Sequence, residues 1–462
     1  MPFSGRPPPH VDRRPLSTAV DYAADRESRK TKWNNWIINQ ELEPYIKHPL
    51  DSTPPGNPFG IHFLGTGAGA ASIQRNASCT ALTTGKNTFI FDAGEGMQKQ
   101  CMLSNRVRLG DVSKIFITHL HGDHIFGLPG LLLFLQNSER HRREQLKKNK
   151  KKKLIPANHA PKTLEIYGPV GLYNYIAAAI SLSCTELNLM KIDVYEMTGG
   201  SRRWVHPGSL ADYAEFRNRG MHRHSIPQEK DGTWTLQTPR EINTPEDAIR
   251  NQSQPSGFLI KAAQVMHVAK LQCFGFVVQE PLTQPRKIDV EKANAAGVEN
   301  FESYKQLKAG FAVPSDDGSR MVQPEEVYLD GAVVRKPRKL ALLGDCCAVP
   351  RPMAELCTDA DVLVHEATFL DTVEGAKFDK GGHSSALMAA NVARRVGAKT
   401  LFMNHISQSY CDTESEYKLI IEAEKILKPH GIRVQLTYDH LDFLVPQTGF
   451  PWENDTKKVS RA

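Results

Sequence analysis

Residues 119–124 read His-Leu-His-Gly-Asp-His and follow the apolar run Ile115-Phe116-Ile117, a pattern that predicts a buried strand leading into a polar turn. Three imidazoles and a carboxylate on one turn are nitrogen and oxygen ligands of the kinds that Zn²⁺ binds. A single catalytic zinc takes about three protein ligands, so four on one turn point to two metals side by side. The alternative is a polar loop rich in histidine, which the position behind a buried strand disfavours.

Two metals need further ligands, and three residues elsewhere follow apolar strands in the same way. His267 comes after Val265-Met266, Asp345 closes the run at 340–344, and His405 closes the run at 401–404. Each also has a structural interpretation, as a buried histidine bonded to backbone or as an aspartate that caps a helix. Because three such residues accompany the first motif, we interpret them as ligands.

The bulk composition indicates a folded protein with a mild positive charge, which we expect to be intracellular. The chain has 462 residues, 40% of them hydrophobic, and a formal net charge of +7, which is compatible with a polyanionic partner. Its eight cysteines form no C-x-x-C pair, and the sequence has neither a secretory signal nor an apolar stretch of membrane-spanning length. We therefore expect reduced thiols and no membrane partner.

The chain divides by composition into a leader, a folded domain and a tail. Residues 1–57 are proline-rich and charged, residues 58–448 form the expected domain, and residues 449–462 form the tail. Acidic residues in the leader argue against a mitochondrial transit peptide, so we expect the cytoplasm or nucleus. A polar stretch at about 200–257 is interpreted as a surface insertion.

Apolar strands that end in glycine-containing loops alternate with helical patterns along the expected domain. Strands are predicted at 61–67 and 88–91, and helices at 388–396 and 416–427. This alternation indicates an α/β protein with layered sheets.

Six motifs, in a fixed order between about residues 60 and 445, resemble those of a known family. They are Phe63-Leu64-Gly65-Thr66-Gly67, Asp92-Ala93-Gly94-Glu95-Gly96, the string at 119–124, His365-Glu366-Ala367-Thr368, Gly382-His383-Ser384-Ser385 and Asn404-His405-Ile406-Ser407. The first three resemble the opening of the metallo-β-lactamase fold, and the later ones resemble ribonuclease Z, the tRNA 3′-processing endonuclease. The resemblance implies an αββα sandwich with insertions.

The resemblance also implies a two-zinc centre. One Zn²⁺ is expected on His119, His121 and His267, the second on Asp123, His124 and His405, with Asp345 bridging them. A hydroxide shared by the two ions would attack the phosphodiester of precursor tRNA after the discriminator base, leaving a tRNA 3′-hydroxyl and a trailer 5′-phosphate.

The leaving oxygen needs a proton, and the expected general acid is His383, oriented by Glu366. Asp123 is expected to act on the attacking water as well. In the alternative, His383 and Glu366 form a structural pair.

A basic run at 139–153 holds nine Lys or Arg against two Glu, and it is the candidate for RNA phosphate contacts. The residues singled out are Lys150, Lys151, Lys152 and Lys153. A solvated loop or a nuclear-localisation patch is the alternative. The resemblance also implies a tRNA-binding arm at about 281–335, although residues 297–302 lack the Gly-Pro motif that relatives often carry there.

Two other functions stay open on sequence alone. One is a hydrolase of the same fold that acts on a small ester, thioester or cyclic phosphodiester, and the other is a non-catalytic RNA-binding or scaffold protein. The resemblance implies precursor tRNA as the partner and a homodimer, since short members of the family pair.

Overall fold

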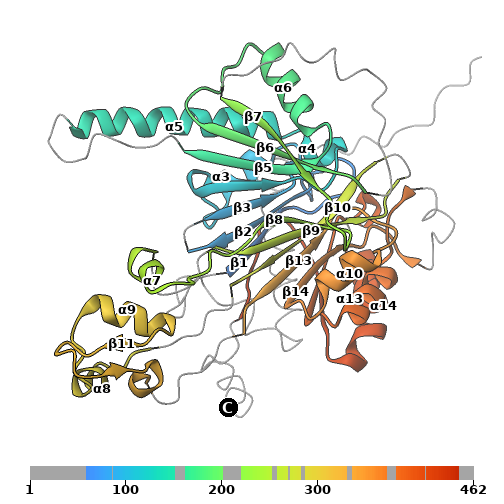
Figure 1. The fold of residues 1–462 in the computed structure, drawn as a ribbon. Helices are drawn as coiled ribbons and strands as arrows, with labels where there is room; N and C mark the ends of the chain where they lie inside the picture. Colours follow the sequence, from blue (N-terminus) through green and yellow to red (C-terminus); the bar gives the residue numbers. More distant parts are fainter. Residues whose placement is uncertain are drawn as a thin grey trace, which may run out of the picture. The chain divides into compact units, whose positions relative to one another are not determined.

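A computed structural model of the chain describes residues 59–85, 87–150, 162–200, 220–251, 257–268, 271–281, 287–329, 336–371, 381–410 and 413–446. Within these ranges two large β-sheets pack face to face, and helices pack on both sheets (Figure 1). The predicted αββα sandwich is therefore confirmed. The leader at 1–57 and the tail at 449–462 lie outside the described residues.

The first sheet has eight strands, antiparallel at one side and parallel from β3 to β7. In spatial order they are β17 (Leu441–Leu444), β1 (Phe59–Gly65), β2 (Cys79–Thr84), β3 (Thr88–Phe91), β4 (Val112–Phe116), β5 (Thr163–Pro169), β6 (Lys191–Thr198) and β7 (Met221–Pro227). Both strands predicted from sequence, at 61–67 and 88–91, are found here as β1 and β3.

The second sheet has seven strands, of which β13 to β16 run parallel. In spatial order they are β16 (Arg433–Leu436), β15 (Thr400–Asn404), β14 (Val362–Glu366), β13 (Lys339–Leu343), β10 (Cys273–Gln279), β9 (Leu259–Val265) and β8 (Thr233–Gln237). Because parallel strands point the same way, the residues that follow β13, β14 and β15 meet at one edge of the sheet.

Aromatic side chains fill the space between the sheets. The Phe116 ring of β4 lies 5.3 Å from the Phe276 ring of β10, and Phe63 of β1 lies 5.3 Å from Phe402 of β15, measured between ring centroids. All four are fully buried. Burial of a phenylalanine side chain contributes about 1.5–3 kcal/mol to the stability of the fold. These contacts therefore stabilise the packing of the two sheets, and the site lies at the edges of those sheets.

Helices complete the layers. On the first sheet they are α3 (Met97–Leu103), α5 (Leu128–Lys150) and α6 (Leu172–Leu182), and on the second sheet α10 (Arg351–Cys357), α13 (Ala386–Val396) and α14 (Thr413–Leu427). The helices expected at 388–396 and 416–427 are thus found as α13 and α14. None of the described helices is long and apolar enough to cross a membrane.

The remaining described segments lie between these elements. The stretch expected to be a surface insertion at about 200–257 contributes β7 and β8, an edge strand for each sheet, and then α7 (Pro245–Asn251). Residues 287–329, in the expected arm region, have a small core of their own. It is built by α8 (Val290–Ala295), α9 (Phe301–Ala309), the pair β11 (Val313–Pro314) and β12 (Met321–Val322), and the 3₁₀ turn η4 (Pro324–Val327).

Candidate active site

Ends of strands from both sheets bring the seven expected ligands together. The turn after β4, which includes α4 (Gly122–Ile125), carries four of them, and the residues after β9, β13 and β15 carry the other three. Chemically they are five imidazoles and two carboxylates, all with less than half of the side chain exposed. Those residues are His119, His121, Asp123, His124, His267, Asp345 and His405.

Three imidazoles form the first group. His121 Nδ1 lies 3.0 Å from His119 Nε2 and 3.3 Å from His267 Nε2. Nitrogens bound to one tetrahedral zinc at about 2.0–2.1 Å would lie about 3.3 Å apart, so this spacing fits ligands of a single ion. The structure also shows that His121 presents Nδ1, whereas the other two present Nε2.

The second group combines a carboxylate with two imidazoles, and Asp345 lies between the groups. Asp123 Oδ2 is 3.3 Å from His405 Nε2 and 3.5 Å from His124 Nε2. Asp345 Oδ2 is 3.3 Å from His405 Nε2, 3.4 Å from His124 Nε2 and 3.7 Å from His119 Nε2. One oxygen therefore reaches both groups, as a bridging ligand must.

The charges at this site fit a bound cation. His124 Nε2 is buried and forms no hydrogen bond with any described residue, although two carboxylates lie near it. Burial lowers the pKa of His124, but Asp345 and Asp92 outweigh it and raise that pKa well above its usual value. Burial opposes ionisation of Asp345, but charge interactions with the surrounding histidines outweigh it and hold the pKa of Asp345 well below its usual value. A divalent ion would supply the positive charge that these buried carboxylates attract.

Residues behind the ligands hold their rings in place, and sequence reasoning gave them no role. His124 Nδ1 contacts Asp92 Oδ2 at 2.7 Å, and that carboxylate also accepts hydrogen bonds from Thr118 N and Oγ1. The carbonyl of Gly382 accepts from His267 Nδ1 at 2.7 Å. Such partners fix the tautomer and leave Nε2 free for a metal. One feature of the sequence could have identified Asp92 as a site residue: it follows β3 directly, as Asp345 follows β13.

Asp123 is held by a backbone loop as well as by its histidine neighbours. Gly69 N donates to Asp123 Oδ2 at 2.8 Å. Asp439 anchors both ends of that loop, since it accepts from Thr66 N and Oγ1 at one end and from Asn76 N at the other. Burial opposes ionisation of Asp123, but the neighbouring imidazoles of His124 and His405 hold its pKa well below the usual range. Asp123 is therefore a carboxylate at any physiological pH.

His383 lies beside the ligands and is paired with Glu366. Its Nδ1 is 3.1 Å from Glu366 Oε2 and 3.8 Å from Asp345 Oδ2, and 20% of its side chain is exposed. Burial lowers the pKa of His383, but the two carboxylates outweigh it and raise that pKa to about 9. Glu366 is buried and also accepts hydrogen bonds from Cys346 N and Thr368 Oγ1. The pair can present a protonated imidazole at the edge of the site.

The four lysines expected to contact RNA are not joined to this site by the structure. Lys150 is the last residue of α5, and its side chain is not among those described. Lys151, Lys152 and Lys153 lie outside the described residues. Their contact with RNA stays a prediction.

Comparisons with known proteins agree with this geometry. Residues 73–182 match the family described as the metallo-beta-lactamase superfamily. The chain is 35% identical to human "Zinc phosphodiesterase ELAC protein 1" over 76% of this chain and 86% of that protein. It is 31% identical to "Ribonuclease Z" of Ligilactobacillus salivarius over 80% of this chain and 94% of that protein. The crystal structure of human tRNase Z, short form, covers 84% of this chain and 99% of its own, at 27% identity and a TM-score of 0.51.

These similarities span most of the described fold and nearly the full length of the relatives, and the site offers the ligand set of a zinc hydrolase. The chain therefore belongs to the ribonuclease Z family of hydrolytic endoribonucleases, within the metallo-β-lactamase superfamily.

Proposed function

We propose that the protein removes the 3′ trailer from precursor tRNA, cutting after the discriminator base to leave a tRNA 3′-hydroxyl and a trailer 5′-phosphate. The observation that carries the proposal is the position of the His383–Glu366 pair against the cluster of seven ligands. A cluster for two metals with a proton donor beside it suits a phosphodiester, whose leaving alkoxide must be protonated. The tRNA substrate is proposed because the relatives carry the names ribonuclease Z and tRNase Z.

We assign two zinc ions to the cluster. His119, His121 and His267 would hold the first, and Asp123, His124 and His405 the second, with Asp345 shared. When bound, the two ions would lower the pKa of a water molecule and neutralise charge that develops on the phosphate oxygens.

The chain's own residues then position the reactants and move the protons. Asp123, fixed by the Gly69 amide, accepts a hydrogen bond from the attacking water and sets its direction. His383 donates a proton to the leaving 3′ oxygen, and Glu366 keeps that imidazole protonated and oriented. Asp92 holds His124 while charge changes at the site.

A hydrolase of a small ester, thioester or cyclic phosphodiester is the second candidate, because the same ligand set could serve it. One experiment separates the two. Purified protein is assayed for metal content, then incubated with a precursor tRNA that carries a 3′ trailer and, separately, with bis-p-nitrophenyl phosphate. Accurate trailer removal supports the proposal, whereas hydrolysis of the small diester without any cleavage of tRNA contradicts it.

The pH dependence of cleavage is expected to shift when Glu366 is replaced by Gln. His383 acts as an acid, so activity falls as pH rises through its pKa of about 9. The substitution removes one of the carboxylates that raise this pKa, so the alkaline limb should move to lower pH by at least about one unit. Measurement of kcat from pH 6 to 10 tests this. Glu355→Gln, at an exposed position on α10, is the control, and an unchanged alkaline limb in Glu366→Gln would contradict the role.

The salt dependence of RNA affinity tests the basic run. The described arm, residues 287–329, holds eight acidic and five basic residues, so charge favours phosphate contact at the end of α5 instead. Replacing Lys150 to Lys153 with Ala should weaken RNA binding and lower the slope of log affinity against log salt by up to about three to four units. An unchanged slope would remove the run from the binding surface. Pairing of two copies and the cytoplasmic or nuclear compartment stay predictions.

A further inference from the structure

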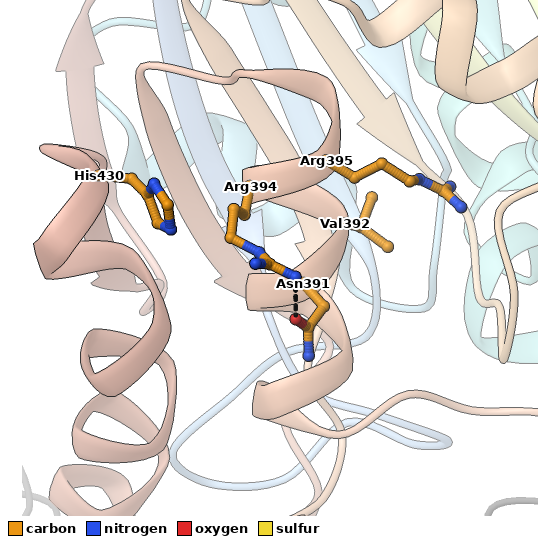
Figure 2. Close-up of a pocket in the computed structure, with 5 residues that line it drawn as sticks. All are labelled: Asn391, Val392, Arg394, Arg395 and His430. Atoms are coloured by element: carbon orange, nitrogen blue, oxygen red, sulfur yellow. Dashed lines mark hydrogen bonds between the residues drawn. The ribbon is translucent and has the colours of Figure 1, made fainter.

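A second hollow lies on the outer helical layer, on the side of α13 that faces away from the second sheet. It has a volume of about 520 Å³ and is lined by residues from the last two turns of α13 and from the 3₁₀ turn η6 (Lys428–His430). Figure 2 shows the lining residues Asn391, Val392, Arg394, Arg395 and His430, with His430 facing Arg394 from the neighbouring element.

The hollow carries positive charge at Arg394, which faces His430, whereas the Arg395 side chain extends to the other side (Figure 2). Arg394 Nη2 donates to the side-chain oxygen of Asn391 at 3.3 Å, and Arg395 Nη2 donates to the carbonyl of Val349 at 2.8 Å. Both partners are uncharged, and among the residues that the structure describes neither guanidinium is paired with a carboxylate. Other arginines of the fold are paired with one, as Arg338 is with Glu280 at 2.6 Å.

We propose that this hollow binds a phosphate group. A guanidinium offers planar paired donors that match phosphate oxygens, and it is the preferred side chain for such recognition. His430 adds a further donor from the opposite side, and Lys428 is exposed on the same turn. The phosphate could belong to a free nucleotide or to the backbone of a bound RNA, and the two sources are distinguished below.

The hollow is separate from the metal cluster. The helix α13 begins directly after His383 to Ser385 and ends at Val396, before β15 begins. Arg394 lies eight residues after Ala386, which at 1.5 Å per residue is about 12 Å along the helix axis from the end beside His383. A phosphate in the hollow is therefore not the one that is cleaved, and the proposal stands whether or not the proposed cleavage of tRNA is correct.

Cations in the last turn of a helix also have a purely structural use, since they offset the partial negative charge of the helix end. That use predicts a change in thermal stability when Arg394 is replaced, but no ligand. The phosphate site predicts binding that depends on Arg394 and His430 at unchanged fold.

The test is isothermal titration of the zinc-loaded protein with pyrophosphate, ATP and adenosine. We expect pyrophosphate and ATP to bind with one site per chain and adenosine not to bind. Arg394→Gln should lower the affinity for ATP about tenfold or more. Arg394→Lys should lower that affinity less, because lysine keeps the charge and loses only the paired donors. Arg108→Gln, at an exposed arginine on the other sheet's side of the fold, is the matched control and should change nothing.

Two results would overturn the proposal: no binding of either phosphate compound, or equal binding by wild type and by the Arg394→Gln, His430→Gln double variant, which would place the ligand at the metal cluster. Circular dichroism melting of each variant verifies the fold. Titration with mature tRNA separates the sources. If Arg394→Gln lowers the affinity for tRNA as much as the affinity for ATP, the bound phosphate is that of RNA. If the affinity for tRNA is unchanged, the site binds free nucleotides.

Discussion

Replacement of Asp123 by Ala is expected to lower the rate of precursor tRNA cleavage by about 10³-fold or more. Asp123 Oδ2 lies near His405 Nε2 and His124 Nε2 and accepts a hydrogen bond from the Gly69 amide. The substitution would therefore remove a proposed metal ligand and the group that we propose to direct the attacking water. Zinc content should fall with activity, because the second ligand group keeps only its two histidines and Asp345. Cleavage of a labelled precursor and metal analysis of the same preparation measure both effects.

The matched control removes a carboxylate of the same type outside the site. Asp111 is exposed in the short turn η2 (Leu109–Asp111), and Asp111→Ala should retain activity and zinc. Activity of Asp123→Ala within about tenfold of wild type, at full zinc content, would contradict the role given to Asp123.

Replacement of His383 by Ala should slow cleavage of precursor tRNA much more than hydrolysis of bis-p-nitrophenyl phosphate. A 3′ alkoxide leaves poorly without a proton, so kcat for precursor tRNA should fall by about 10²- to 10⁴-fold. The p-nitrophenolate ion is a stable leaving group that needs no proton, so hydrolysis of bis-p-nitrophenyl phosphate should change little. The difference between the two losses measures general acid catalysis directly.

Zinc content decides between this role and a structural one. His383 Nδ1 is 3.8 Å from Asp345 Oδ2, so loss of the ring could act through the metals instead. Full zinc content together with a larger loss of rate on precursor tRNA than on the small diester supports the role of His383 as general acid. Equal losses on the two substrates, or loss of zinc, would assign His383 to the support of the metal cluster. His222→Ala, at an exposed histidine of β7, is the control.

The sequence predicts the layered fold and the expected ligands because both follow from local patterns of apolar and polar residues. Each ligand follows an apolar run, and a strand that ends in a polar turn places that turn at a sheet edge, as for His405 after β15. The role of Asp92 was not predicted. Its position after β3 resembles that of a ligand, and only the 2.7 Å contact with His124 Nδ1 shows that it supports one.

The basic run shows a second limit of local patterns. Its composition indicates charge but not conformation, and the structure extends α5 through it to Lys150. Likewise, the polar composition at 200–257 gives no strand pattern, whereas β7 and β8 in that stretch are strands at the edges of the sheets. That the stretch is an insertion stays a prediction. Edge strands have one side open to solvent and so tolerate polar residues, which hides them from a search for apolar runs.

The sequence by itself determined which chemistry the chain carries, because residue type and order along 119–124 define a set of hard and borderline ligands regardless of packing. Only the tertiary structure decided which of these residues form each ligand group and which lie beside them. The long-range pairing of two sheets places Asp345 Oδ2 between both ligand groups, turns Nδ1 of His121 toward the first, and sets His383 against Glu366. Asp345 lies 60 positions from His405 and 226 positions from His119 in the sequence, and no local pattern specifies contacts between residues so far apart.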